Sequence, residues 1–198
     1  TTPIIIGTAE AGSTVTLFVD GVTTGVTTTA DGTTGAYTIA PTAALNDGAY
    51  ALTVKATDAA GNISDASDAL SITVDATAPG KPSIITTTSL TNDATPTIEG
   101  IAEAGSTVEL FNGDASLGTT TANGDGQFSI TTSTLADSNY VLTVTATDAA
   151  GNISDASSAL NLTVDTTAPA KPIITTTTSL TNDSTPAIEG AAEAGSTV

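Results

Sequence analysis

Acidic and amide side chains recur in this sequence at glycine-containing turns. The segment ATDAAGNISDAS fills residues 56–67 and returns letter for letter at 146–157. In each copy an Asp precedes an Asn by four residues: Asp58 and Asn62, then Asp148 and Asn152. Calcium takes about six to eight oxygen ligands, and carboxylates, amide oxygens and the backbone carbonyls of such turns are its preferred partners. The chemistry that these residues suggest is therefore cation binding.

Turn formation is the alternative interpretation of the same residues. Asp, Asn and Gly belong in tight turns for backbone reasons alone, and exposed carboxylates keep a protein soluble. The repeated segment is not an EF-hand loop, because Ala150 occupies the third position, which needs a ligand, and no Glu closes the loop. Calcium binding and plain turn formation both remain open at this point.

The composition argues against catalysis. The chain has no His, no Cys and no Arg, which leaves carboxylate pairs or a Ser–Lys pair as the available catalytic groups. The acidic residues recur once per repeat at turns, whereas an active site seldom comes as an identical array. We therefore expect that this protein is not an enzyme.

The net charge also limits the partners. Three lysines against 21 acidic residues give a formal charge of −18, which repels nucleic acid and anionic membranes and attracts cations. No apolar run approaches the roughly 18 residues of a membrane span. We expect no nucleic-acid partner and no direct membrane insertion in this part of the chain.

A period of about 90 residues organises the whole chain. The motif AEAGSTV stands at 9–15, 102–108 and 192–198, and KPSIITTTSLTND at 81–93 returns as KPIITTTTSLTND at 171–183. This frame predicts the following division: residues 1–75 are a repeat that lacks its first strand, residues 76–165 are a complete repeat, and residues 166–198 are the opening strands of a further repeat. We interpret the chain as a segment of a longer array.

Within each repeat, apolar residues alternate with polar ones, as they do in half-buried strands. In NYVLTVTATD, alternation places Tyr140, Leu142, Val144 and Ala146 on one face. The amino-acid composition is rich in Val, Ile, Leu, Ala and Thr and includes only six aromatic residues. Seven strands are expected in the complete repeat, near residues 83–89, 96–102, 106–112, 116–121, 126–132, 139–147 and 158–165. The predicted fold class is all-β: tandem immunoglobulin-like β-sandwich repeats of about 90 residues, joined head to tail as a rod.

The aromatic residues carry two further expectations. Tyr50 and Tyr140 open the sixth strand, where the hydroxyl of a tyrosine corner bonds back across the preceding turn, although an ordinary core tyrosine is an alternative. Alternation places Phe18 and Phe111 on the outer face of the sheet, unless a local bulge turns them inward.

Successive turns of such a sandwich alternate between its two ends, so carboxylates gather at both ends. Where a short linker joins two repeats, one end meets the next and a hard cation would compensate the charges. For the junction between the first two repeats, the expected ligands are Asp75, Glu103, Asp148 and Asn152. Asp58 and Asn62 are expected to serve a preceding junction, and Asp165 and Glu193 the following one.

The run TAPxKP, followed by NDxTPxIEGxAEAGSTV, a D-G-x-aromatic turn and YxLTVxATDAAGNxS, resembles the tandem bacterial Ig-like repeats of giant surface adhesins and biofilm-associated proteins, of the Bap and type I secreted kind. The resemblance covers the whole chain. It implies Ig-like sandwiches that are exported from the cell, are stiffened by calcium at their junctions, and hold a binding tip away from the cell surface.

Three functions follow as hypotheses. The first is the structural extender of a large extracellular adhesin or biofilm matrix protein, at the bacterial cell surface or in the matrix. The second is a self-assembling extracellular filament or sheath, in which other copies of the same chain are lateral partners. The third is a lectin-like module, which would need one repeat that departs from the others, and none does. Repeat identity favours the first two, with neighbouring repeats of the same chain as the main partners.

Overall fold

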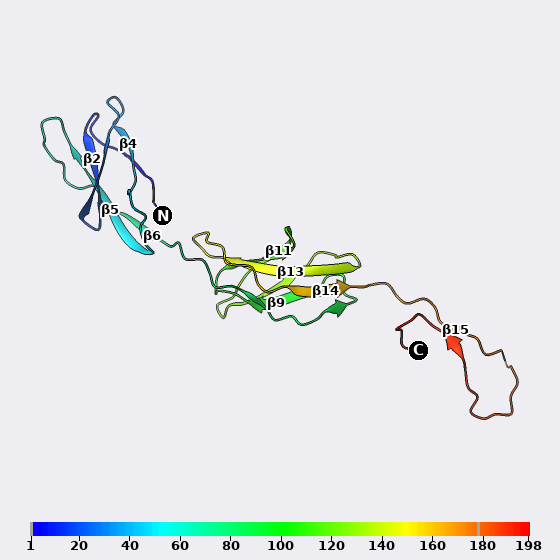
Figure 1. Ribbon diagram of the computed structural model, residues 1–198. Coiled ribbons are helices and arrows are strands. Elements are labelled where there is room, and N and C mark those ends of the chain that lie inside the picture. Colours follow the sequence, from blue (N-terminus) through cyan, green and yellow to red (C-terminus); the bar gives the residue numbers. More distant parts are fainter. Residues whose placement is uncertain (1, 178) are drawn as a thin grey trace. The chain divides into compact units, whose positions relative to one another are not determined.

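The computed structural model describes residues 2–177 and 179–198, and every regular element among them is a β-strand. These residues fall into two compact units, one comprising Thr1–Pro79 with Thr147–Ser154 and the other comprising Gly80–Ala146 with Asp155–Val198 (Figure 1). In the part of the chain that the structure describes, no helix is long and apolar enough to cross a membrane.

The second unit contains a sandwich of two sheets. One sheet has the strand order β11-β10-β13-β14-β8 and the other has the order β12-β9-β7. Its strands are β7 (Ser83–Ile84), β8 (Leu90–Thr91), β9 (Thr97–Ile101), β10 (Thr107–Asn112), β11 (Ala115–Thr121), β12 (Gln127–Thr131), β13 (Ser138–Thr147) and β14 (Leu160–Val164). The all-β, Ig-like sandwich that the sequence predicts is therefore confirmed.

In place of the single first strand expected near 83–89, the structure has two short strands, one at the start of that range and one just after it, which lie in different sheets. The first, β7, pairs with β9 through Ser83↔Ile101 and Ile84↔Gly100. The second, β8, pairs in parallel with β14 in the other sheet. Because one extended strand cannot serve both sheets of a sandwich, the chain crosses from one to the other between these two short strands.

The core of this sandwich comes from the alternating apolar positions. Leu142, Val144 and Ala146 of β13 are fully buried. They belong with the other inward-facing residues that the pattern selects, namely Ile98, Val108, Leu110, Phe128, Ile130, Leu162 and Val164. Burial of short aliphatic side chains, worth roughly 1.5–3 kcal/mol for each Val or Leu, is what holds the two sheets together.

The first unit has two sheets of the same kind with fewer strands. Their orders are β3-β2-β5-β6 and β1-β4. The strands are β1 (Ile5–Thr8), β2 (Thr14–Val19), β3 (Val22–Thr29), β4 (Ala36–Ile39), β5 (Gly48–Thr57) and β6 (Leu70–Val74). Its buried cluster is smaller and consists of Ile5, Leu17, Ile39 and Leu52.

Both expected tyrosine corners are present. The Tyr140 hydroxyl donates to the Ala136 carbonyl at 2.9 Å, and the Tyr50 hydroxyl donates to the Asn46 carbonyl at 3.1 Å. Each bond ties the start of a long strand to the turn before it, in the manner that the position after LADSN or LNDGA indicates.

Phe18 and Phe111 are half-buried and lie outside the two core clusters, so they face outward as the alternation predicts. A register irregularity lies beside each of them, between Thr16 and Phe18 in β2 and between Leu110 and Phe111 in β10. In the first unit the Lys55 ammonium lies 5.7 Å from the centre of the Phe18 ring, a cation–π arrangement.

The last described strands are β15 (Ile173–Ile174) and β16 (Gly190–Ala191), which pair antiparallel. This pairing, Ile173↔Ala191 and Ile174↔Gly190, reproduces that of β7 with β9. No further strand among the described residues covers it, and Ile173 and Ile174 are 59% and 73% exposed.

Candidate functional site

The repeated turn that begins at Asp58 and at Asp148 is a closed hydrogen-bonded unit. Asp148 Oδ1 accepts from the N–H groups of Ala150 and Asn152, at 2.8 and 2.9 Å, and its Oδ2 accepts from Asn152 Nδ2 at 2.8 Å. Asp58 makes the same three bonds with Ala60 and Asn62, at 2.9, 2.8 and 2.7 Å. Both copies of the repeated segment therefore build one geometry.

These bonds stabilise the charged form of each carboxylate. The pKa of Asp58 is lowered, first by the Asn62 side chain and then by backbone N–H groups. The pKa of Asp148 is lowered in the same way, with the Asn152 side chain as the main cause. Gly61 and Gly151 both have φ of 91°, a conformation that strains residues with a Cβ, so the Gly of each segment is required by the turn.

Serines of the same segment pair with the long strand beside it. The hydroxyls of Ser64 and Ser67 accept from the N–H groups of Ala56 and Val54, at 3.0 and 3.1 Å. In the second copy, the Ser157 hydroxyl accepts from Val144 N–H at 3.0 Å. The residues that follow the turn therefore run along β5 and β13, and their serine hydroxyls take the place of backbone carbonyls as hydrogen-bond acceptors for the strand.

The eight expected metal ligands are distributed as follows. Asp58 with Asn62 and Asp148 with Asn152 form the pairs just described. Within the first unit, Asn152 Nδ2 also donates to the Asp75 carbonyl at 3.2 Å. The side chains of Asp75 and Asp165 accept from N–H groups two residues on, those of Thr77 and Thr167, both at 3.1 Å.

The two glutamates have separate roles. The Glu103 carbonyl accepts from the N–H and the hydroxyl of Ser106, at 3.1 and 2.7 Å, and closes its turn. Glu193 Oε2 accepts from Ala170 N–H at 2.9 Å. No bond between Asp165 and Glu193 is found among the described residues.

Acidic side chains do not cluster into a metal site among the described residues. Nowhere among them do three or more Asp, Glu, His or Cys side chains come together as a metal site would require. Each repeated turn offers one carboxylate and one amide, well short of the six or more oxygens that calcium takes. Calcium binding at these turns stays a prediction.

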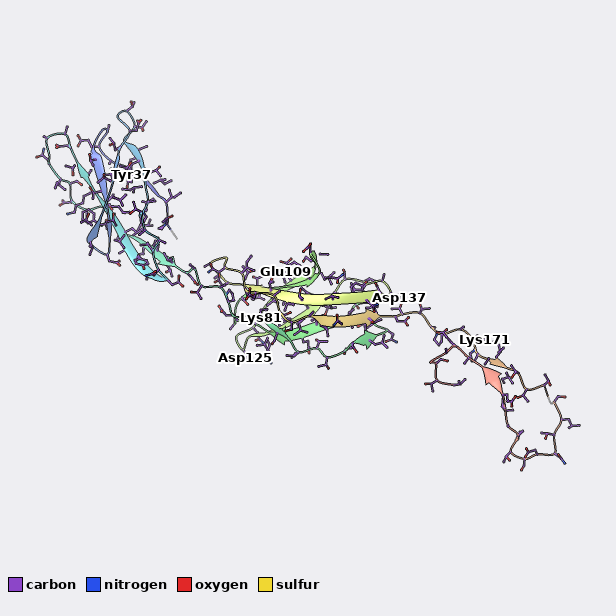
Figure 2. The ribbon with its side chains drawn as sticks, in the orientation of Figure 1. Tyr37, Lys81, Glu109, Asp125, Asp137 and Lys171 are labelled. Carbon is purple, nitrogen blue, oxygen red and sulfur yellow. The ribbon has the colours of Figure 1, made fainter. Side chains whose placement is uncertain are left out.

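A second pair of carboxylates, which the sequence analysis did not select, ties the end of each sandwich to the chain that leaves it. Asp137 accepts from Thr166 N–H and Oγ1 at 2.9 and 2.7 Å, and from Thr167 Oγ1 at 2.6 Å. These bonds lower its pKa to about 2, with the Thr167 hydroxyl as the largest cause. Asp125 lies at the opposite end of the same sandwich (Figure 2).

Asp47 does the same in the first unit. It accepts from the Thr77 hydroxyl and, at 2.7 Å, from Ala76 N–H, and both bonds lower its pKa, with the Thr77 hydroxyl as the larger cause. Ala76 has no hydroxyl, so Asp47 makes fewer bonds than Asp137. The only sequence signal for this contact is the constant spacing between the Asp of the LND or LAD turn and the TAP linker.

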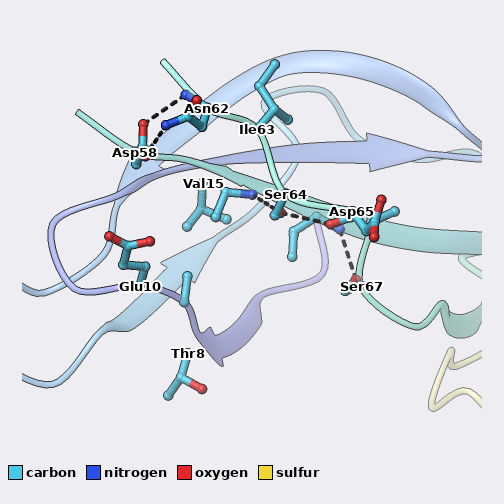
Figure 3. Close-up of a pocket in the computed structure, with 13 residues that line it drawn as sticks. Thr8, Glu10, Val15, Asp58, Asn62, Ile63, Ser64, Asp65 and Ser67 are labelled. Atoms are coloured by element: carbon cyan, nitrogen blue, oxygen red, sulfur yellow. Dashed lines mark hydrogen bonds between the residues drawn. The ribbon is translucent and has the colours of Figure 1, made fainter. Parts of the chain in front are cut away.

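A groove opens in the first unit beside the repeated turn (Figure 3). Its volume is about 460 Å³, and it is lined by the end of β1, by β5 and by residues 62–67. Three carboxylate residues, Glu10, Asp58 and Asp65, stand around it. The groove contains no imidazole, thiol or guanidinium, since the whole chain has none.

Comparison with known proteins agrees with this geometry. The family described as "Bacterial Ig-like domain" matches residues 1–76 and 83–166. Chitinase A1 of Niallia circulans is 36% identical over 124 residues, which cover 57% of this chain and 17% of the chitinase. Exoglucanase B of Cellulomonas fimi is 37% identical over 142 residues, 63% of this chain and 12% of the exoglucanase. The chain thus spans under a fifth of each relative.

Among solved structures, one match supports the fold. The fibronectin(III)-like modules of Clostridium thermocellum CbhA match 81% of this chain and 85% of their own at a TM-score of 0.52 and 15% identity. A biofilm-associated protein BSP domain matches 83% of this chain and 28% of its own at a TM-score of 0.37 and 24% identity. At these identities the likeness concerns the fold alone.

Proposed function

Because the chain belongs to the bacterial Ig-like domain family, we propose that it is a structural extender within a large extracellular bacterial protein, an adhesin or a biofilm matrix protein. In this role each repeat is a stable spacer, and the work of the array is to hold another part of the protein at a distance. The repeats themselves carry out no reaction.

The observation that supports this proposal is the duplication of the polar geometry. The three bonds of Asp58 and the three of Asp148 agree in partners and, within 0.1 Å, in length. Both sandwiches also fasten the outgoing linker with a carboxylate, Asp47 or Asp137. A catalytic or ligand-binding role would favour divergence in one copy, whereas a mechanical role favours equal copies.

We further propose that calcium stiffens the array at the acidic turns, with Asp148 and Asn152 among its ligands. The net charge of −18 and the Asp–Asn pairs support this, while the missing third acidic ligand speaks for turn formation alone. Extracellular modules bind calcium with dissociation constants of about 10⁻⁴ to 10⁻³ M, so millimolar calcium is the relevant test condition.

A distance measurement tests the stiffening. Ser71 and Asn161 are exposed and the chain has no cysteine, so Ser71→Cys with Asn161→Cys accepts two spin labels cleanly. We expect a broad distance distribution in EDTA that narrows in millimolar calcium. Asp148→Ala should abolish the narrowing, whereas Asp114→Ala, an exposed acid outside the repeated turn, should leave it intact. Equal distributions in EDTA and calcium would contradict stiffening without touching the extender role.

A second candidate is a spacer module in a secreted polysaccharide-degrading enzyme. It is favoured by the matches to segments of a chitinase and an exoglucanase. In both candidates the chain is a spacer that does not itself bind polysaccharide. A pull-down with polysaccharide tests this shared property. We expect the 198-residue chain to stay in the supernatant with chitin and cellulose; retention on either would contradict a passive spacer and favour a carbohydrate-binding module.

A further inference from the structure

The turn between β11 and β12 has the same backbone hydrogen bonds as the turn between β3 and β4. In the second repeat, Gly126 N–H donates to the Asn123 carbonyl and Asn123 N–H donates to the Gln127 carbonyl, both at 2.9 Å. In the first repeat, Asp31 makes the two corresponding bonds, both at 2.8 Å. One turn is therefore built twice, with an asparagine in one copy where the other has an aspartate.

The Asn123 side chain folds back over the residues that follow it. Its Oδ1 accepts from the N–H groups of Asp125 and Gln127, at 3.0 and 2.9 Å. Both donors lie beyond Gly124 in the chain, so the carboxamide stands on the side of the Gly124 peptide nitrogen. Its Nδ2 donates to Gln127 Oε1 at 3.3 Å, which is longer than a typical hydrogen bond. The turn therefore holds the oxygen of this amide more firmly than its nitrogen.

Gly124 supplies an accessible nitrogen beside this amide. The residue is exposed and faces open space where a Cβ would stand. Among the described residues, no group accepts a hydrogen bond from its N–H. A glycine nitrogen reaches the side-chain carbon of a preceding asparagine with the least steric hindrance, because glycine has no Cβ. The chain contains two such Asn–Gly pairs, at 112–113 and 123–124.

We propose that Asn123 is a self-modification site, at which the Gly124 nitrogen attacks the Asn123 side-chain carbon and releases ammonia. The new bond joins the Gly124 nitrogen to Cγ, and the bond from Cγ to Nδ2 breaks. The proton of the Gly124 N–H leaves with the ammonia, and a five-membered succinimide ring remains. Water then adds to one of the two ring carbonyls and opens the ring to aspartate or isoaspartate. The new carboxyl group ionises, so the turn gains one negative charge.

The two N–H groups on Oδ1 favour the first step. Negative charge develops on this oxygen as the nitrogen adds to Cγ, and backbone donors already in place stabilise such a charge. The N–H groups of Asp125 and Gln127 stand at 3.0 and 2.9 Å and need not move to do so. Asn123 is exposed, so the ammonia leaves directly to water. The turn thus provides an oxyanion hole for its own asparagine.

The first repeat shows that the aspartate product fits this turn. Asp31 Oδ1 accepts from the N–H groups of Thr33 and Thr34, at 3.0 and 2.7 Å. The pKa of Asp31 is lowered, first by the Thr34 N–H and then by the Thr34 hydroxyl. A carboxylate at position 123 would accept from backbone N–H groups in the same way, as a charge-assisted bond. The isoaspartate product lengthens the main chain by one carbon and should loosen the turn.

Asn112 provides an internal comparison. It also precedes a glycine, but it lies in β10 and pairs with Ala115 of β11. Its Oδ1 accepts from Val141 N–H at 3.0 Å, from a residue 29 positions further along the chain. Its carboxamide is therefore directed across the sheet and not toward the Gly113 nitrogen. The two Asn–Gly pairs should differ in reactivity in the folded chain, and this expectation is independent of the extender role.

Peptide mapping of the full 198-residue chain tests the proposal. The folded protein is incubated at mildly alkaline pH, and mass spectrometry follows the replacement of the amide by a carboxyl group at each Asn–Gly pair. We expect Asn123 to convert at least about tenfold faster than Asn112, because placement of the reacting groups decides the rate. In urea the two rates should become similar. Labelling by an isoaspartyl methyltransferase should detect isoaspartate at position 123, as ring opening requires.

Gly124→Ala is the matched variant. The open space around Gly124 and its ordinary φ let the fold persist, while the added Cβ hinders the attack. Conversion of Asn123 should therefore fall at least about tenfold. Equal rates at Asn112 and Asn123 in the folded chain would overturn the proposal. So would an Asn123 that stays intact when folded but converts in urea, or conversion that gives no isoaspartate or survives Gly124→Ala unchanged.

Discussion

The Asp137 carboxylate accepts the hydroxyl of Thr166 at 2.7 Å and its N–H at 2.9 Å, and so fastens the loop before β13 to the chain that leaves β14. The contact spans 29 residues of sequence and sets the direction in which the linker departs. Asp47 makes the equivalent contact in the first unit. In a protein built from repeats, the residue that orients the outgoing linker influences how successive repeats follow one another.

This contact predicts a specific response to acid. Hydrogen bonds lower the Asp137 pKa from 3.8 to about 2, so the folded state favours the ionised form. The stabilisation is therefore complete above pH 3.8 and is lost as the pH falls toward 2. Carboxyl chemical shifts in an NMR titration should show Asp137 titrating near 2, and Thr166→Ala together with Thr167→Ala should raise that midpoint. A midpoint near 3.8 in the unmodified protein would contradict the hydrogen bonds.

Two glycine substitutions test whether the repeated turn needs a glycine with positive φ. Gly151 has φ of 91° and open space around its missing Cβ, so Gly151→Ala tests backbone strain without a steric clash. We expect a loss of roughly 1 kcal/mol of unfolding free energy. Gly124 also faces open space but lacks the positive φ, so Gly124→Ala should be neutral or stabilising by up to about 1 kcal/mol. Urea unfolding of the full chain measures both changes.

Most of the fold could be predicted because it depends on local alternation. The period-two pattern predicts the burial of Leu142 and Val144, and Leu52, the counterpart of Leu142 in the first repeat, is buried as well. The crossing of the first strand between sheets was not predictable, because Ser83–Ile84 and Leu90–Thr91 differ in their pairing partners and not in their pattern.

The candidate site was less accessible from sequence. Asp148 and Asn152 were found because Asp-x-x-Gly-Asn is a local signal, and they do lie together. Asp137 is not among the predicted site residues, because its threonine partners lie 29 and 30 residues away in the sequence. A carboxylate that accepts hydrogen bonds from residues far away in the sequence leaves no local pattern. The sequence therefore shows the charge of such a residue but not its hydrogen-bond partners.

The tyrosine corner predicts a difference between two conservative substitutions. Tyr140→Phe removes the 2.9 Å bond to the Ala136 carbonyl and should cost about 0.5–1.5 kcal/mol. Tyr37→Phe is the control, because the second repeat already has Phe128 at that position, and it should change little. Calorimetry of the two variants provides the comparison. Equal melting temperatures would mean that the Tyr140 hydroxyl is as well satisfied by water.

A final prediction uses the unequal burial of equivalent valines. Val144 is fully buried beneath the strand that covers its repeat, whereas Val54 lines an open groove. Truncation removes apolar contacts in proportion to what is buried, so Val144→Ala should cost roughly 2 kcal/mol and Val54→Ala about half as much. The change in unfolding free energy is measured in the full chain, from the unfolding transition of the repeat that carries the substitution. A cost at Val54 that equals the one at Val144 would mean that the groove is already closed in solution.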